Sequence, residues 1–126
     1  MHIPAELRYS SDHEWVRVDG ATVTIGITEY AQDALGDVVF VDVPDSGLTV
    51  AAGESFSEVE STKSVSDIYA PISGSVIEVN PALESTPELL NSDPYGEGWI
   101  CRIEVANASE LEGLMDADAY RALTEG

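Results

Sequence analysis

The sequence predicts a mainly β protein, built as a small antiparallel sandwich or flattened barrel with short helices near its C-terminus. Short apolar or β-branched runs recur along the chain, residues typical of turns separate them, and helix-capping patterns gather towards the end. The chain has 126 residues, of which 44% are hydrophobic, and is long enough to bury one ordinary core. We therefore expect residues 1–126 to form a single domain.

The first third of the chain should form a β-hairpin and a short helix. The expected strands, in which residues alternate or run β-branched, are 14–18 and 21–27. Asp19-Gly20 suits the tight turn between them. Thr28 is placed to cap a helix over residues 29–35, and Gly36 is placed to end it.

The middle of the chain should contain further strands separated by turns. Residues 38–43 are too apolar to face water on both sides, which predicts a strand ended by Pro44 to Gly47. Ala52-Gly53 then turns the chain into a second hairpin. Pro71 to Gly74 is expected to be another turn, followed by a strand over residues 75–79.

Helical signals are most frequent in the last third. Thr86-Pro87-Glu88 has the pattern of a cap followed by a first-turn proline, which predicts a brief helix before the loop at residues 91–98. Ser109 to Glu112 has capping-box spacing, and Asp116 is placed to cap the final helix. The last strand and the last helix are expected at residues 99–105 and 117–123.

Lys63 is the only lysine in the chain. Apolar or β-branched residues on both sides of it predict two short strands, and Ser61-Thr62-Lys63-Ser64 predicts the turn that joins them. An amine at a hairpin tip is solvated and can be reached by another protein's active site, as an attachment point requires. A lysine in a polar turn is commonly a plain surface charge. With only five basic residues against 24 acidic ones, however, a generally basic surface does not explain its presence.

The net charge of −19 limits the partners that the chain can have. Nucleic acid and anionic membranes are not expected, because binding to them requires clustered Lys and Arg. The acidic surface either steers the protein towards basic rims on partner enzymes or reflects a source whose proteins are all acidic, and the sequence leaves both open. No segment has the apolar length of a membrane span, and the first residues lack the pattern of a signal or transit peptide, so a cytoplasmic location is expected.

The sequence contains little that would support catalysis. His2 and His13 are its only histidines, and it has no phosphate loop, dinucleotide fingerprint or cysteine pair. With 24 carboxylates, close acidic pairs arise by chance and say little about acid–base chemistry. The single cysteine, Cys101, lies in an apolar run and should be a small buried side chain rather than a reactive thiol. We therefore expect no catalytic residue and no metal site.

Several blocks of the sequence match one known family in order. E-S-T-K-S around Lys63, followed by S-D-I-Y-A-P-I-S-G, resembles the lipoyl attachment hairpin of the glycine cleavage system H protein family. Four further blocks are similar to that family: Y-S-S-D-H-E-W-V (Tyr9 to Val16), G-I-T-E-Y-A-Q-D-A-L-G-D-V-V-F-V (Gly26 to Val41), V-P-D-S-G (Val43 to Gly47) and L-L-N-S-D-P-Y-G-E-G-W (Leu89 to Trp99). The resemblance therefore covers almost the whole chain.

The resemblance implies a fold, a cofactor and a set of partners. The fold is a hybrid barrel-sandwich of two antiparallel sheets, with the lipoyl hairpin at one end and the C-terminal helices outside. The cofactor is lipoate, joined by an amide bond to Lys63, and the lysine with its lipoyl chain would reach about 14 Å. The implied partners are glycine decarboxylase, which uses pyridoxal phosphate, the tetrahydrofolate-dependent aminomethyltransferase, dihydrolipoyl dehydrogenase and a lipoate-attaching enzyme. The carrier passes the aminomethyl group of glycine between them and is expected to be a monomer.

Residues beside Lys63 are expected to matter for its modification. Bulk near the amine would obstruct entry to a narrow modifying site, so Glu60 and the small residues Ser61, Thr62 and Ser64 are expected to help the lipoate-attaching enzyme accept the hairpin. Glu60 can equally be an ordinary strand residue that faces solvent.

The resemblance also implies that the arm folds back into a surface cleft. Glu14 and Asp67 lie at matching positions of the H-E-W and S-D blocks, and Asp12 stands where a serine is common in relatives. Their carboxylates would hold a cationic aminomethyl group by charge-assisted hydrogen bonds. The alternatives are that Glu14 and Asp67 are plain surface acids and that Asp12 lies harmlessly in water.

Two other interpretations compete with this one. Biotinyl domains and the lipoyl domains of 2-oxoacid dehydrogenases share the hairpin, but they usually flank the lysine with methionines or with an aspartate and an alanine, which Thr62 and Ser64 do not fit. A protein of the same shape could also serve as a lipoyl relay or donor in lipoate metabolism, or as an unmodified binding module. Lys63 argues against the unmodified form and leaves the relay open.

Overall fold

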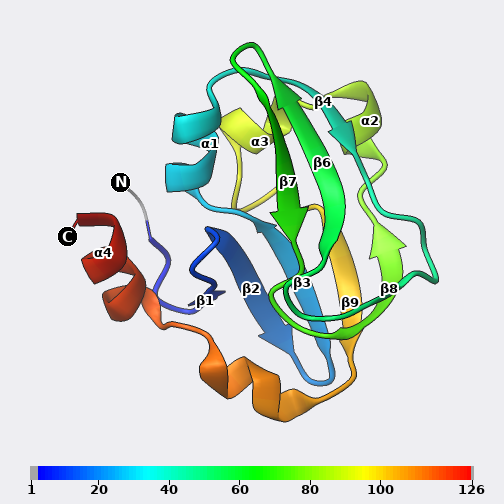
Figure 1. Ribbon diagram of the computed structural model, residues 1–126, viewed down its shortest axis with the longest axis vertical. Helices are drawn as coiled ribbons and strands as arrows, with labels where there is room; N and C mark the ends of the chain where they lie inside the picture. Colours follow the sequence, from blue (N-terminus) through cyan, green and yellow to red (C-terminus); the bar gives the residue numbers. More distant parts are fainter. Residues whose placement is uncertain (1–2, 126) are drawn as a thin grey trace.

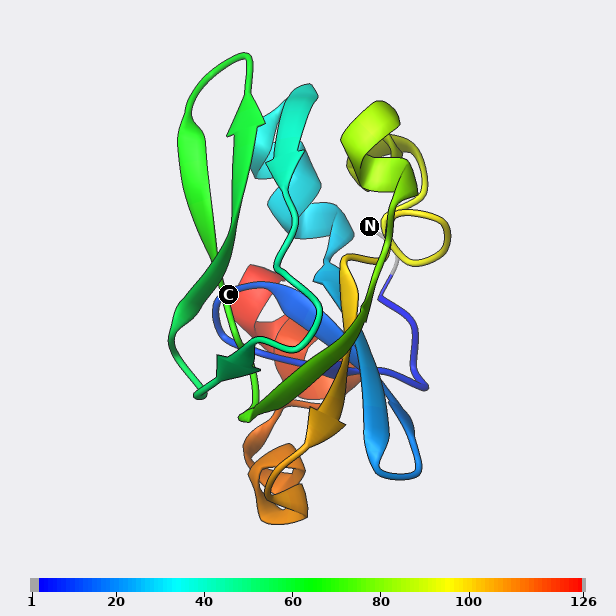
Figure 2. The ribbon, with the colours of Figure 1, turned by 90° about the vertical axis from the view of Figure 1, so that its right-hand side faces the viewer.

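Two antiparallel sheets face each other and form the body of the protein (Figures 1 and 2). The structure is a computed structural model and describes residues 3–125. One sheet has six strands in the order β1-β2-β3-β9-β8-β5, and the other has three in the order β4-β6-β7. All the strand pairs within both sheets are antiparallel. The predicted mainly β barrel-sandwich is therefore confirmed.

The strands and helices are short. The six-stranded sheet contains β1 (Arg8–Tyr9), β2 (Glu14–Asp19), β3 (Thr22–Ile27), β5 (Thr49–Val50), β8 (Gly74–Val79) and β9 (Cys101–Val105). The three-stranded sheet contains β4 (Val38–Asp42), β6 (Ser55–Ser61) and β7 (Val65–Tyr69). The helices are α1 (Glu29–Leu35), α2 (Ala82–Ser85), α3 (Leu89–Ser92), the 3₁₀ helix η1 (Ala108–Gly113) and α4 (Ala117–Glu125). Among residues 3–125, no helix has the length and apolar character needed to cross a membrane.

The first hairpin and the first helix form as predicted. β2 and β3 pair along their whole length, and Gly20 adopts a φ of 64° in the turn, a conformation that glycine tolerates without steric cost. The Thr28 hydroxyl oxygen accepts the backbone N–H of Ala31 and so caps α1, which ends before Gly36. α1 is thereby fixed at both ends beside the three-stranded sheet.

The elements that the sequence did not reveal are the shortest ones. β1 and β5 have two residues each and α2 has four, too few to show hydrophobic periodicity. The capping box expected at Ser109 is wrong, because the Asn107 side chain caps this segment by accepting the Ser109 N–H, and the segment is a 3₁₀ helix. The last strand begins at Cys101 rather than at residue 99. Asp116 caps α4 as predicted, accepting the N–H of Ala119 at 2.8 Å.

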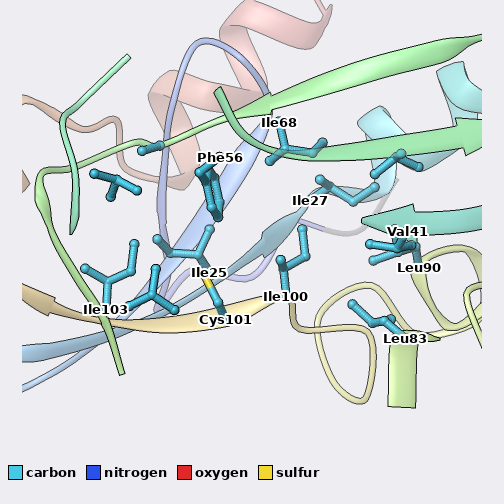
Figure 3. Close-up of a cluster of buried hydrophobic side chains, with 14 of the residues drawn as sticks. Ile25, Ile27, Val41, Phe56, Ile68, Leu83, Leu90, Ile100, Cys101 and Ile103 are labelled. Carbon is cyan, nitrogen blue, oxygen red and sulfur yellow. The ribbon is translucent and has the colours of Figure 1, made fainter. Parts of the chain in front are cut away.

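The main hydrophobic core lies between the two sheets (Figure 3). Ile25, Cys101 and Ile103 of the six-stranded sheet pack in it with Phe56 and Ile68 of the three-stranded sheet. Burial raises the pKa of the Cys101 thiol to about 12, so the thiol stays protonated. Cys101 is therefore a small buried side chain, as predicted.

A second cluster of buried side chains lies on the opposite face of β2, against α4. The adjacent residues Val16 and Trp15 point to opposite faces of the strand, so Val16 joins the main core and Trp15 joins this second cluster. Tyr9 of β1 and Tyr120 of α4 also belong to it, with their rings stacked 4.7 Å apart at an interplanar angle of 10°. The C-terminal helix is thus held to the sheet by aromatic packing.

Candidate functional site

Lys63 lies at the tip of the hairpin formed by β6 and β7, which projects from one end of the molecule (Figure 1). The hydroxyl oxygen of Ser61 accepts the backbone N–H groups of Lys63 and Ser64, each at 3.2 Å. The same hydroxyl donates to the Ser64 carbonyl at 3.1 Å. One small side chain therefore sets the shape of the turn and leaves the lysine exposed.

The tip is also braced by the loop that follows α1. The Thr62 N–H donates to the carbonyl of Asp37 at 3.0 Å. The aliphatic stem of Lys63 passes close to Gly36, where an added Cβ would lie 3.2 Å from Lys63 Cε. Asn91 of α3 donates to the Gly36 carbonyl at 2.8 Å and so fixes this loop from the other side. The lysine stem therefore has a defined support beneath it.

The charged end of Lys63 forms no ion pair with an acidic side chain of residues 3–125. The ion pairs among residues 3–125 join Arg102 to Glu78 and Arg121 to Glu125. An ammonium in this position can be approached by another protein.

Glu60 lies on the outer face of the three-stranded sheet, directly below the turn. It pairs with Phe40 of β4 and with Val65 of β7, while the neighbouring Val59 points into the core. Phe40 and Val65 are 49% and 57% exposed, so two apolar side chains flank one carboxylate near the tip.

A groove of about 240 Å³ begins beside Lys63. Its walls come from β7, from α1 and from the loop before β2, and it is lined by Asp12, His13, Ile27, Tyr30, Ala31, Ala34, Leu35, Ser64, Ser66, Asp67 and Ile68. Ser64, the residue after the lysine, forms its near end. Larger hollows of about 290 and 380 Å³ lie elsewhere on the surface; the first shares Asp12 with the groove, and no residue of the turn lines either of them.

The three acidic residues predicted for a cleft occupy different positions. Asp12 and Asp67 line the groove, whereas Glu14 does not line it and is only 2% exposed. Ser10 donates its hydroxyl hydrogen bond to the Glu14 carboxylate at 2.6 Å. Burial raises the pKa of Glu14 to about 7, and the nearby charge of Asp12 adds to this, while the hydrogen bonds from Ser10 and the Tyr69 backbone oppose it. Glu14 is therefore a buried carboxyl group and not a surface acid.

The structure adds groove residues that sequence reasoning did not single out as a site. His13 lines the groove with a φ of 71°, an uncommon conformation outside glycine, and its ring lies 4.5 Å from that of Tyr30. Ala31 and Ala34 leave room along the helix face beside Tyr30. The sequence did contain a signal for this wall, because small residues one helical turn apart open a space between a helix and its neighbour.

The fold and the site together define a class of protein. A sole lysine, exposed at a hairpin tip of a two-sheet β protein and followed by a surface groove, is the arrangement of a swinging-arm carrier.

The comparisons with known proteins identify the family. The family model described as glycine cleavage H-protein matches residues 7–126. Glycine cleavage system H proteins of Beutenbergia cavernae and Symbiobacterium thermophilum are 58% and 56% identical to this chain; the first match covers 100% of this chain and 99% of the relative, and the second covers 98% and 97%. The crystal structure of a glycine cleavage system H protein from Mycobacterium marinum matches with a TM-score of 0.90 and 43% identity, covering 98% of this chain and all of that one. The chain therefore belongs to the glycine cleavage H-protein family, whose members are lipoyl-bearing carriers and not enzymes.

Proposed function

We propose that this protein carries lipoate on Lys63 and moves the aminomethyl group of glycine from glycine decarboxylase to the tetrahydrofolate-dependent aminomethyltransferase. Dihydrolipoyl dehydrogenase then reoxidises it. The observation that carries the proposal is the sole lysine of the chain at an exposed hairpin tip with a groove beginning one residue away. The protein is proposed to act as a single-domain monomer, and its bacterial relatives support a cytoplasmic location.

The residues around Lys63 fit a lipoyl group. Once attached through an amide, lipoate supplies a dithiolane that accepts and releases the aminomethyl group. The protein contributes an exposed amine, small neighbours that leave it accessible, and a support for its stem at Gly36. These features present the arm without restricting its far end.

We further propose that Glu60, Ser61, Thr62 and Ser64 help the lipoate-attaching enzyme accept the hairpin. That enzyme must reach the amine itself, so its rim has to cover the residues immediately around Lys63. Glu60 stands between the exposed Phe40 and Val65 in that area. Replacing Thr62 and Ser64 together by methionine should slow lipoylation by the native enzyme, and an undiminished rate would count against recognition of the turn.

The groove is proposed as the shelter of the loaded arm. The cargo is a cation that water can attack, and Asp12 and Asp67 place two carboxylates along the groove. Glu14 does not line the groove. Its carboxyl group lies buried behind the wall and accepts a hydrogen bond from Ser10. The variant Asp12→Asn with Asp67→Asn should keep its fold and its lipoylation but lose formaldehyde and ammonia faster once loaded; equal decay rates would exclude a role for the two carboxylates.

A reconstituted reaction tests the function as a whole. Protein lipoylated by the attaching enzyme is mixed with the decarboxylase, the aminomethyltransferase, tetrahydrofolate and the dehydrogenase, and glycine-dependent release of carbon dioxide is measured. Release that requires the lipoylated protein supports the proposal. If the protein is inactive here but passes its lipoyl group to other acceptor proteins, it is a lipoyl relay or donor instead.

A further inference from the structure

A buried hydroxyl group of the C-terminal helix joins two walls of the groove. Tyr120 of α4 is fully buried, and its Oη lies 2.8 Å from Nδ1 of His13 and 2.6 Å from Oγ1 of Thr28. His13 lies in the loop before β2 and lines the groove, while Thr28 caps α1, the helix that forms the facing wall. A single side chain from the end of the sequence therefore touches both elements between which the groove is formed.

The hydrogen bonds of Thr28 favour one direction for this chain of contacts. The Thr28 oxygen already accepts the backbone N–H of Ala31, and the residue is fully buried, so its own proton needs an acceptor. Tyr120 Oη is within reach and takes that proton. In this arrangement the tyrosine proton points at Nδ1 of His13, which is then the unprotonated nitrogen of a neutral imidazole.

His13 is held in place from several directions. Its carbonyl accepts the N–H of Thr28 at 3.1 Å, and its N–H donates to the Ser10 carbonyl at 3.1 Å. The ring packs against Tyr30 on one side and meets the edge of the Tyr120 ring on another. Burial lowers the pKa of His13, with the charge of Asp12 opposing the shift, which agrees with a neutral ring.

We propose that Tyr120 is a positioning residue of the arm-sheltering groove, whose hydroxyl holds His13 as a neutral imidazole in the groove wall. The inference rests on the proposed function, because it matters only if a cationic cargo enters the groove. An imidazolium would place a positive charge beside that cargo and repel it. With a neutral His13, the described ionisable groups near the ring are the acids Asp12 and Asp67 and the neutral tyrosines Tyr30 and Tyr120. Glu14, the next residue, is buried behind the wall, and burial raises its pKa to about 7.

The test is Tyr120→Phe, with Tyr9→Phe as its matched control. Both variants keep the stacked ring pair, and each loses one buried hydroxyl, but the Tyr9 hydroxyl donates to the Pro4 carbonyl, and Pro4 does not line the groove. Nitrogen chemical shifts of the His13 ring, measured on unlipoylated protein, report its tautomer and its titration. Tyr120→Phe should disturb the tautomer and raise the titration midpoint by about half a pH unit or more, and Tyr9→Phe should do neither.

The second measurement is the decay of the loaded carrier near pH 6.5. Tyr120→Phe should lose its cargo about threefold faster or more, whereas adding His13→Asn should restore slow decay, because asparagine is never charged and tolerates positive φ. An unchanged His13 titration overturns the proposal, and so does an unchanged decay rate beside a changed titration. Failure of the shelter itself would be visible already in the native protein, as decay no slower than that of free aminomethylated lipoamide.

Discussion

The hairpin tip and the wall of the groove are fixed by opposite means. At the tip, the shape of the turn depends on Ser61 and Ser64, three residues apart, and on backbone groups, and Lys63 remains exposed. At the groove wall, His13 is held by Tyr120, 107 residues away in the sequence, through a buried side chain. A mobile arm thus starts from a turn whose shape is set by neighbouring residues and whose base is braced by Asp37, and it is proposed to dock against a wall in which His13 is held by Tyr120 of α4.

This difference suggests that substitutions at the tip affect function with little effect on stability, whereas substitutions at the wall affect both. Side chains at the tip make few apolar contacts, so changing them should affect modification with little effect on folding. The side chains that hold the wall from behind, Tyr120, Thr28 and Glu14, are buried, so changing them should affect stability and pH dependence as well. The predictions below test this separation, from the largest expected effect to the smallest.

Lys63→Arg should abolish lipoylation completely while the protein folds normally. Arginine keeps the positive charge and a long aliphatic stem, but its guanidinium is not an acylable primary amine. The intact mass after incubation with the lipoate-attaching enzyme and lipoate checks the first part, and a urea unfolding curve superimposable on that of the native protein checks the second. Lipoylation that persists in this variant would refute the assignment of Lys63.

Glu14→Gln should change how stability depends on pH. Burial raises the pKa of Glu14 from its ordinary value of 4.5 to about 7, so the folded protein binds this proton more tightly than the unfolded chain. The native protein therefore loses stability from this group as the pH rises from about 4.5 to about 7, by roughly 3 kcal/mol in total. Urea unfolding of both proteins across this range should show a difference in free energy of unfolding that shifts in favour of the variant as the pH rises. Parallel curves would show that Glu14 is not a buried titrating group.

The tip could be predicted from the sequence because every signal for it is local. Lys63 is unique, its neighbours are small and polar, and the flanking strands are apolar, so the turn and its exposure follow from a few adjacent residues. The α1 helix was predictable for the same reason, since Thr28 and Gly36 mark its two ends. Residues close in sequence determine the Lys63 turn and α1, so both elements could be predicted before the tertiary structure was known.

The wall could not be predicted in the same way. Nothing near Tyr120 in the sequence indicates that its hydroxyl reaches His13 and Thr28, because those contacts exist only after α4 packs on the sheet. Glu14 shows the same limit: the H-E-W block placed it in a cleft, but its 2% exposure follows from strands and loops that close around it. Burial is a property of the assembled fold, and the sequence pattern of one strand does not contain it.

Gly36→Ala should destabilise the protein by about 1–3 kcal/mol, because its φ of 79° and ψ of −156° belong to a region that is essentially restricted to glycine. The added methyl group would also lie 3.2 Å from Lys63 Cε, but the flexible stem can move aside, so the backbone accounts for most of the effect. Urea unfolding checks the stability. Gly113→Ala is the matched control, since its φ is not positive and an added Cβ meets nothing within 4 Å. Equal stability of the two variants would contradict the explanation.

The smallest effects should come from one substitution made in both regions, Ser61→Ala at the tip and Ser10→Ala at the wall. Each serine hydroxyl donates one hydrogen bond and accepts backbone N–H groups, so the chemistry removed is similar. At the tip, water replaces the lost partners, and the free energy of unfolding should fall by less than about 1 kcal/mol. Behind the wall, the buried carboxyl group of Glu14 loses the hydrogen bond from Ser10 and keeps the one from the Tyr69 backbone, which should cost about 1–3 kcal/mol. Lipoylation should remain rapid in Ser10→Ala, since Ser10 is not part of the turn. If Ser61→Ala proved the more destabilising of the two, the tip would be a structural element of the fold, and the separation of function from stability at Lys63 would be wrong.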